Sequence, residues 1–302
     1  MSSVTVSLKK QIMLGVIGIT IILLVIEVFA NVWWITQIHC EFEQSEIFQN
    51  IDEVEKRQLC LDFYEVKTTG DVLIPSQRFD SIAINSLGFR GAEFSAIKPP
   101  DTYRIFTVGG STMFGAGATS DETTIPGYLQ QLLNEKEFGF DIEVINSGIQ
   151  GADNNKESKL IEQKLVRFSP DLIIIYDGMN DLRAGNSPND LKENWKAICE
   201  FGKENDFDVI ISLHSIAGFG NKVLTKQELE YTQTGKYYNK NSLIESLSVY
   251  QDYAKNLLEI KNCAKTIDLR DVFDDEVGPI YWDEVHVSDR GNAIVAKSLY
   301  NV

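Results

Sequence analysis

From residue 104 onward, short apolar runs alternate with longer stretches that have helical spacing. The runs RIFTV, DIEVI, DLIIIY, DVIISL and KTIDL predict strands at residues 104–108, 141–145, 171–176, 208–213 and 265–269. The stretches after them predict helices at residues 124–136, 155–168, 191–205, 242–260 and 288–300. Alternation of this kind forms βαβ crossovers, so helices are expected on both faces of a parallel sheet. We therefore predict an α/β protein with a flavodoxin-like three-layer α/β/α fold and a five-stranded parallel sheet.

A long apolar segment precedes this region. Residues 12–35 contain one charged side chain, Glu27, and about 20 apolar residues suffice for a helix to cross a bilayer. Lys9 and Lys10 precede the segment and acidic residues follow it, so the positive-inside rule predicts a cytoplasmic N-terminus and an extracytoplasmic remainder. Two alternatives stay open. The first alternative is a cleaved signal peptide, since residues 28–30 fit a signal peptidase site. The second is a buried core helix.

Composition and turn signals divide the 302-residue chain into three parts. We expect a cytoplasmic tip and transmembrane anchor at residues 1–36, a membrane-proximal extension at residues 37–102, and one α/β domain at residues 103–302. The boundary at residue 102 rests on the paired prolines of KPPDTY, which are typical of a linker. A formal net charge of −16 excludes nucleic acid as a partner, because its recognition requires basic patches.

The four cysteines are Cys40, Cys60, Cys199 and Cys263. Four cysteines allow three pairings, and sequence does not choose among them. We expect Cys40 to pair with Cys60, because this bond would close a loop beside the membrane in an oxidising compartment. The sequence has no C-x-x-C pattern and no Cys/His cluster, so no metal site is predicted.

A glycine-rich bend, FTVGGSTMFGAG, follows the first predicted strand and carries Ser111 at its crest. Bends of this kind often bind phosphate, but a phosphate loop needs a lysine after its last glycine. Here Gly115 is followed by Ala116. The dinucleotide pattern G-x-G-x-x-G also fails, because no glycine stands three residues after Gly117. The bend therefore favours a serine nucleophile over a nucleotide site.

Other polar and glycine residues follow the remaining predicted strands. In parallel sheets ligands bind outside the carboxyl ends of the strands. The residues at these positions are Ser111 after the first strand, Gly148 and Gly151 after the second, Gly178 and Asn180 after the third, and Asp283 and His286 after the fifth. The last pair lies further along the chain, and a loop of about a dozen residues returns it to the site.

A serine nucleophile requires a base and a residue that orients the base. The chain has three histidines, of which His39 is juxtamembrane and predicted to be structural or interfacial. His214 ends the fourth strand, where a hydrogen-bonded structural histidine is the favoured interpretation over a pocket residue. His286 follows Asp283 by three residues. Asp283 is then able to accept a hydrogen bond from Nδ1 of His286 and leave Nε2 facing a serine.

Taken together, these blocks resemble the SGNH (GDSL-type) hydrolase family over residues 103–301. The matching segments, in order, are GGST, NSGIQGAD, DGMND and DEVH. The resemblance implies that Ser111 is the nucleophile and that His286 and Asp283 complete a triad. It also implies that the amides of Ser111 and Gly151 and the side chain of Asn180 form the oxyanion hole. No cofactor is implied.

The segments NSLGFRG and KPPDTYRI are similar to the lead-in of membrane-anchored members of the family. One departure is Gly110, which stands where an aspartate is common. Residues 216–241 match no block and are expected to form a lid-like insertion that shapes the substrate pocket.

The sequence therefore predicts a membrane-anchored extracytoplasmic serine esterase. Its expected substrates are carboxylic esters, either O-acetyl groups on cell-surface glycans or lipid esters. Two alternatives remain: an O-acyltransferase that uses the same triad, and a non-catalytic binding or scaffold module of the cell envelope. The sequence leaves the oligomeric state open.

Overall fold

The computed structural model describes residues 7–37, 40, 44–234 and 243–302. The chain forms two compact units, Met1–Cys40 and Glu41–Val302. The first unit contains α1 (Leu8–Gln37), of which Leu8–Trp34 is long and apolar enough to cross a membrane. A signal sequence near an N-terminus can also meet this criterion of length and apolar composition, so the helix is a candidate for either. His39, which the sequence suggested is structural or interfacial, lies outside the described residues.

The second unit is built on a five-stranded sheet with the order β6-β5-β7-β8-β9. The strands are β5 (Thr102–Gly109), β6 (Asp141–Asn146), β7 (Leu172–Asp177), β8 (Asp208–Leu213) and β9 (Lys265–Asp268). All four pairings between neighbouring strands are parallel. Within this sheet, β5 comes first in the sequence and lies between β6 and β7, the next two strands, which is the flavodoxin-like order. The predicted fold class is thus confirmed.

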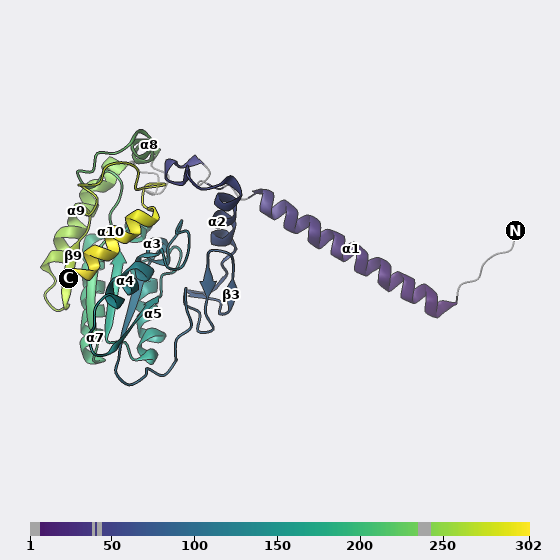
Figure 1. Cartoon of the computed structure of the whole chain (residues 1–302), viewed down its shortest axis with the longest axis horizontal. Helices are drawn as coiled ribbons and strands as arrows, with labels where there is room; N and C mark the ends of the chain where they lie inside the picture. Colours follow the sequence, from purple (N-terminus) through teal and green to yellow (C-terminus); the bar gives the residue numbers. More distant parts are fainter. Residues whose placement is uncertain (1–6, 38–39, 41–43, 235–242) are drawn as a thin grey trace. The chain divides into compact units, whose positions relative to one another are not determined.

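Alternate residues of each strand enter two separate cores. In β7, Ile173 and Ile175 belong to one hydrophobic cluster, whereas Ile174 and Tyr176 belong to the other. The first cluster includes residues of the long helices α5 (Asn154–Gln163), α7 (Pro188–Glu204) and α9 (Leu243–Glu259). The second includes residues of α4 (Ile125–Asn134) and α10 (Asp289–Tyr300). Burial on both faces explains why the strands read as continuous apolar runs, and Figure 1 shows these helices around the sheet.

Local signals explain where several helices begin and end. Ser288 caps α10, as its side chain accepts a hydrogen bond from the amide of Gly291 at 3.2 Å. The helix expected over residues 155–168 is interrupted, because Lys164 leaves helical geometry with φ −122°. A short 3-10 helix, η3 (Leu165–Phe168), follows.

The segment between α1 and the five-stranded sheet contains regular secondary structure. It contains the 3-10 helix η2 (Glu46–Phe48), α2 (Glu53–Glu65), and four two-residue strands, β1 (Thr68–Thr69), β2 (Val72–Leu73), β3 (Gln77–Arg78) and β4 (Ala83–Ile84). Arg90 bridges both Ile84 and Asn146, so this segment is hydrogen-bonded to the end of β6. Residues 41–102 belong to the same compact unit as the sheet. The domain boundary expected at residue 102 stays a prediction.

Two short helices, α3 (Ser111–Phe114) and α6 (Met179–Ala184), follow the ends of β5 and β7. A third, α8 (Lys226–Thr234), lies in the connection between β8 and β9. The last lies in the region expected to be a lid-like insertion, of which residues 235–241 fall outside the described part of the chain.

A disulfide joins Cys199 of α7 to Cys263, two residues before β9. The two cysteines are 64 residues apart, and closing a loop of this length restricts the unfolded chain. Cys40 and Cys60 are each disulfide-bonded, and the expected pairing of one with the other stays a prediction.

Candidate active site

Ser111 lies at the first position of α3, directly after the end of β5. The two glycines before it have no room for side chains. A Cβ on Gly109 would lie 2.6 Å from the carbonyl oxygen of Tyr176, and one on Gly110 would lie 2.3 Å from Nδ2 of Asn180. A side chain at position 110 would therefore collide with the amide group of Asn180 in its present position.

His286 and Asp283 lie in the loop between β9 and α10. Nε2 of His286 is 2.7 Å from Oγ of Ser111, and Nδ1 is 2.6 Å from Oδ2 of Asp283. The other carboxylate oxygen of Asp283 accepts the backbone amides of Val285 and His286, at 2.8 and 2.7 Å. Three residues separated by up to 175 positions thus form one continuous hydrogen-bonded row. Both Asp283 and His286 are buried.

Opposing effects act on the carboxyl group of Asp283. Burial raises its pKa, whereas the charge of His286 and the hydrogen bonds from His286 and Val285 lower it. The net effect is a pKa below the ordinary value, which favours the carboxylate. A carboxylate in this position orients the ring of His286 and fixes which nitrogen carries the proton.

Two residues that the sequence interpretation missed support the histidine loop, which we define as residues 278–286. The ring of Trp282 stacks on that of His286, with centroids 4.7 Å apart and 11° between the planes. Oε1 of Glu228, on α8, accepts the backbone amides of Ile280 and Tyr281 at 2.8 and 3.1 Å. A glutamate in a region without a family motif gave no sequence signal for this role.

Glu228 is itself fully buried and its second oxygen is also paired. Oε2 accepts Nζ of Lys222 at 2.7 Å and the amide of Thr225 at 2.9 Å. The side chains of Lys222 and Glu228 are 4% and 0% exposed. A buried pair of this kind is costly to break, because the remaining charge loses its partner.

The three candidate oxyanion donors border one small cavity. Its volume is about 70 Å³, and its lining includes Ser111, Gly151, Asn180 and His286. Gly151 has φ +69°, a conformation that side chains disfavour. Asn180 lies in the first turn of α6, and its Nδ2 donates to the carbonyl of Ala152 at 2.5 Å. One amide hydrogen of Asn180 is thereby fixed, which leaves the other available.

The two other glycines singled out from the sequence are absent from the described residues that line this cavity. A Cβ on Gly148 would lie 2.1 Å from the amide nitrogen of Phe114, so this glycine allows close packing against α3. Gly178 precedes α6 with φ +119°, and a Cβ there would lie 2.6 Å from a methyl carbon of Leu213. Both positions require glycine for packing or turn geometry.

His214 also borders the cavity, together with Thr112 and Tyr176. Its Nε2 is 2.8 Å from Oγ1 of Thr112, the residue after the candidate nucleophile. Burial, followed by the nearby charge of His286, lowers the pKa of His214 to about 3. The ring is therefore neutral near neutral pH. It is hydrogen-bonded as the structural interpretation expected, and it also forms part of the cavity wall.

Three buried carboxyls, those of Asp177, Asp181 and Glu157, lie close enough to influence one another. Asp177 borders the cavity, and its pKa is raised well above the ordinary value by burial and by Asp181 and Glu157. Burial and the charge of Asp181 also raise the pKa of Glu157. Among the residues that the structure describes, no group of three or more His, Cys, Asp or Glu side chains is arranged to hold a metal ion.

Comparison with known families identifies the class of protein. A sequence model described as the GDSL-like Lipase/Acylhydrolase family matches residues 107–294, which is more than half of the chain. The chain belongs to this family, and it is accordingly a hydrolase of ester bonds. The family resemblance predicted from the sequence is confirmed.

Two solved structures have the same fold at low sequence identity. An acetylxylan esterase from Geobacillus stearothermophilus, in a catalytic-mutant form of Axe2, has a TM-score of 0.51 at 16% identity. A second Axe2 mutant, described as an acetyl-xylooligosaccharide esterase from Geobacillus, has a TM-score of 0.50 at 16% identity. Each similarity covers 66% of this chain and 93% of the other. No curated protein sequence matches this chain.

Proposed function

We propose that this protein is a membrane-anchored, extracytoplasmic serine esterase with Ser111 as nucleophile and His286 and Asp283 as its base and orienting acid. The single observation that supports this role is the hydrogen-bonded row from Ser111 through His286 to Asp283, with steps of 2.7 and 2.6 Å. A serine hydroxyl is a weak nucleophile at neutral pH and needs an adjacent base. Nε2 of His286 is within hydrogen-bond distance of the proton that it would remove.

In the first half of the reaction, Oγ of Ser111 forms a bond to the ester carbonyl carbon and its proton passes to Nε2 of His286. The tetrahedral intermediate collapses, and His286 gives this proton to the departing alcohol. The product is an acyl group on Ser111. In the second half, His286 takes a proton from water, the hydroxide attacks the acyl group, and the proton returns to Ser111 as the carboxylic acid leaves.

Negative charge on the former carbonyl oxygen would be stabilised by three donors. We assign these to the amides of Ser111 and Gly151 and to Nδ2 of Asn180. Asn180 is already held by the carbonyl of Ala152, so little reorganisation is needed when charge develops. The glycine at position 110 permits this approach, because any side chain there would occupy the place of the Asn180 amide.

The proposed substrate is an ester with a short acyl group, above all O-acetyl. A cavity of about 70 Å³ beside Ser111 suits an acyl group of a few carbon atoms better than a long fatty acyl chain. The protein in the two solved structures above is described as an acetylxylan esterase or an acetyl-xylooligosaccharide esterase. We infer an acetyl ester on a cell-surface glycan as the first substrate to test, with lipid esters second.

The proposed location follows from the N-terminal helix and the disulfide. Lys9 and Lys10 at the start of α1 favour a cytoplasmic N-terminus. The disulfide between Cys199 and Cys263 is typical of an oxidising compartment. Both features support an extracytoplasmic catalytic domain.

The test is hydrolysis of p-nitrophenyl acetate by the full chain in detergent and by its Ser111→Ala variant. We expect turnover by the native protein and a loss of at least about 10³-fold in the variant. Equal rates would overturn the esterase proposal. Labelling by a fluorophosphonate, which reacts with activated serines, separates an esterase from a binding module, for which Ser111 stays unlabelled.

A further inference from the structure

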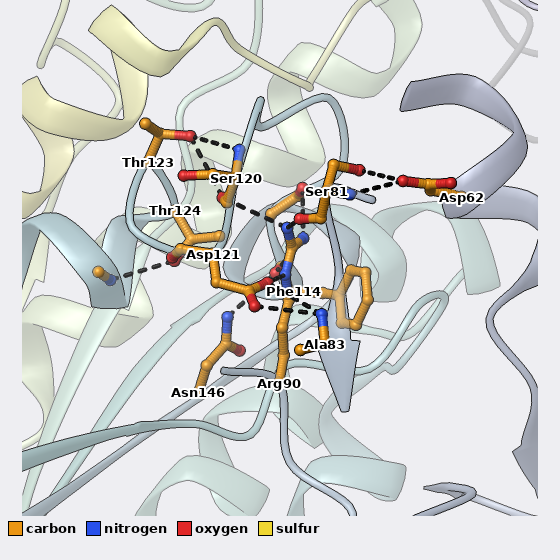
Figure 2. A network of polar contacts seen from close by, with 12 residues as sticks. Asp62, Ser81, Ala83, Arg90, Phe114, Ser120, Asp121, Thr123, Thr124 and Asn146 are labelled. Atoms are coloured by element: carbon orange, nitrogen blue, oxygen red, sulfur yellow. Dashed lines mark hydrogen bonds and ion pairs between the residues drawn. The ribbon is translucent and has the colours of Figure 1, made fainter. Parts of the chain in front are cut away.

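Arg90 lies in the NSLGFRG segment, which precedes the sheet and is not explained by the catalytic residues. Its guanidinium makes five hydrogen bonds, and its side chain is fully buried. Nε donates to Asp121 at 2.7 Å, Nη1 to the carbonyls of Phe114 and Gly115 at 3.1 and 2.9 Å, and Nη2 to those of Ser81 and Ser120 at 3.1 and 3.3 Å. Figure 2 shows this network around the guanidinium.

The carbonyls of Phe114 and Gly115 belong to the end of the turn that presents Ser111. We call residues 110–115 the nucleophile turn. α3 has only four residues, so its last carbonyls lack helical partners. Gly115 ends the helix with φ +100°, and a Cβ there would lie 3.0 Å from Nη1 of Arg90. Arg90 therefore supplies donors to both carbonyls, and the amide of Ala118 also donates to that of Gly115 at 3.2 Å.

The same arginine connects the nucleophile turn to the loop that carries Gly151. The backbone amide of Arg90 donates to the carbonyl of Asn146, at the end of β6, at 3.2 Å. The side chain of Asn146 donates to the carbonyl of Phe114 at 3.0 Å and accepts the amide of Gly148 at 3.0 Å. Arg90 and Asn146 thus hold one carbonyl of the nucleophile turn from two sides, as Figure 2 shows.

Asp121 and the segment before the sheet fix the arginine in turn. Asp121 accepts the amide of Ala83 at 3.1 Å as well as Nε of Arg90. Asp62 of α2 accepts both the amide and the hydroxyl of Ser81 at 2.7 Å, and the carbonyl of Ser81 accepts Nη2. The ring of Phe114 lies 4.9 Å from the guanidinium carbon. The position of Arg90 is therefore defined on all sides.

From these contacts we propose that Arg90 is a positioning residue, which holds the nucleophile turn so that Oγ and the amide of Ser111 meet the substrate correctly. This inference rests on the proposed role of Ser111. A lysine at position 90 keeps the charge, but it has three donors on one nitrogen and cannot reach carbonyls on separate chain segments. The turn then loses part of its support, and misplacement of a reacting atom by about 1 Å costs up to about 100-fold in rate.

Arg104 provides a matched control. Its side chain is also 0% exposed, it pairs with Glu143 at 2.8 Å, and it lies 5.1 Å from the ring of Phe94. Its other nitrogens donate to the carbonyls of Phe168 and Ser95. However, Arg104 lies near the start of β5, about 16 Å along the strand before its last residue. Arg104→Lys should therefore destabilise the fold without disturbing Ser111.

The experiment compares Arg90→Lys with Arg104→Lys in the full chain, using p-nitrophenyl acetate turnover, fluorophosphonate labelling and thermal unfolding. We expect both variants to have a lower Tm. Only Arg90→Lys should lose about 10- to 100-fold in kcat and in labelling rate. Its KM should stay within about twofold, and its pH profile should keep the wild-type inflection, because His286 is untouched.

Asp121→Asn is the second variant, and it decides the matter alone if Arg90→Lys does not fold. It keeps the shape at position 121 and removes the charge that fixes Nε, so a fall of about 3- to 10-fold in kcat at constant KM is expected. An unchanged kcat in Asp121→Asn, or equal losses in the two arginine variants, overturns the role of Arg90 alone. A wild-type protein that neither turns over nor labels overturns both proposals.

Discussion

The nucleophile turn and the histidine loop are each held by a buried charge from outside the sheet, but the two charges are opposite. Arg90 donates to four carbonyls and one carboxylate around the nucleophile turn. Glu228 instead accepts two amides of the histidine loop and two further donors. The first comes from the segment before the sheet and the second from α8.

The difference reflects which backbone groups each turn leaves unpaired. A short helix that ends at Gly115 exposes carbonyls, so its partner must donate. The histidine loop presents the amides of Ile280 and Tyr281, so its partner must accept. Irregular backbone pairs only some of its own polar groups, and buried polar groups without partners are costly. Each turn is therefore matched by the charge complementary to its exposed backbone.

The largest effect on kcat is expected at the hydrogen bond between Ser111 of the nucleophile turn and His286 of the histidine loop. His286→Ala should lower kcat by at least about 10⁴-fold, because the hydroxyl of Ser111 loses its base. The double variant Ser111→Ala, His286→Ala should be no slower than either single variant, since the two residues act as one unit. Turnover of p-nitrophenyl acetate measures this. A double variant about 100-fold slower than both single variants would show that they act separately.

The next effect concerns Asn180, which is held by neither charge. Asn180→Ala should lower kcat by about 10²- to 10³-fold through the loss of one oxyanion donor. The matched control is Asn186→Ala. Asn186 follows the C-terminal end of α6 and is not among the described residues that line the cavity. Its side chain donates to Asp181. We expect this control to lower Tm with less than about a threefold change in kcat. Similar kcat losses in both variants would refute the oxyanion assignment.

Glu228→Gln tests the histidine side alone. The amide group of glutamine would face Nζ of Lys222 and the amide of Thr225, so donors would oppose donors. We expect a loss of about 2–3 kcal/mol in the free energy of unfolding and about a tenfold fall in kcat. Denaturant unfolding and steady-state kinetics measure the two changes.

The control for this variant is Glu143→Gln, which weakens the ion pair with Arg104 far from the histidine loop. It should cost stability and leave kcat unchanged within about threefold. If Glu228→Gln retains wild-type kcat at a temperature where it is folded, the histidine loop does not depend on α8.

The smallest effect is a pH dependence of stability from His214. Its pKa is about 3 in the folded protein against 6.5 as the ordinary value. The unfolded chain binds the proton more readily between these values, so acidification below about pH 6.5 favours unfolding. Between pH 7 and pH 5 this group should cost about 2 kcal/mol. His214→Gln, which keeps a hydrogen-bonding group towards Thr112, should lose that part of the slope in denaturant unfolding; identical slopes would contradict it.

Much of the fold is predictable from the sequence because the sheet is buried on both faces. The run DVIISL predicts residues 208–213, and β8 has these bounds. The alternation of strands with helices predicts parallel βαβ units with helices on both faces of the sheet. The break after Gln163 was not predictable, because the apolar pattern continues through η3 while the backbone leaves the helix at Lys164.

The site divides in the same way. Ser111, Asp283 and His286 have residue types and local spacing that indicate chemistry, and the structure brings all three together. The residue types and local spacing of Arg90 and Glu228 give no such indication, because each residue contacts backbone groups that are distant in the sequence. The sequence pointed to the disulfide between Cys199 and Cys263 only indirectly, as the pair that is left when Cys40 pairs with Cys60. Its geometry depends on where the turn before β9 meets α7.

The stacking of Trp282 on His286 has a consequence for the timing of charge. An indole face attracts a cation more strongly than it attracts a neutral ring. In the proposed mechanism, the imidazole is positively charged while it carries the proton taken from Ser111. The indole, whose plane is within 11° of the ring's, would then favour this short-lived charged state over the resting one. An aromatic residue without a proton to give would thus stabilise the proposed reaction selectively at its charged step.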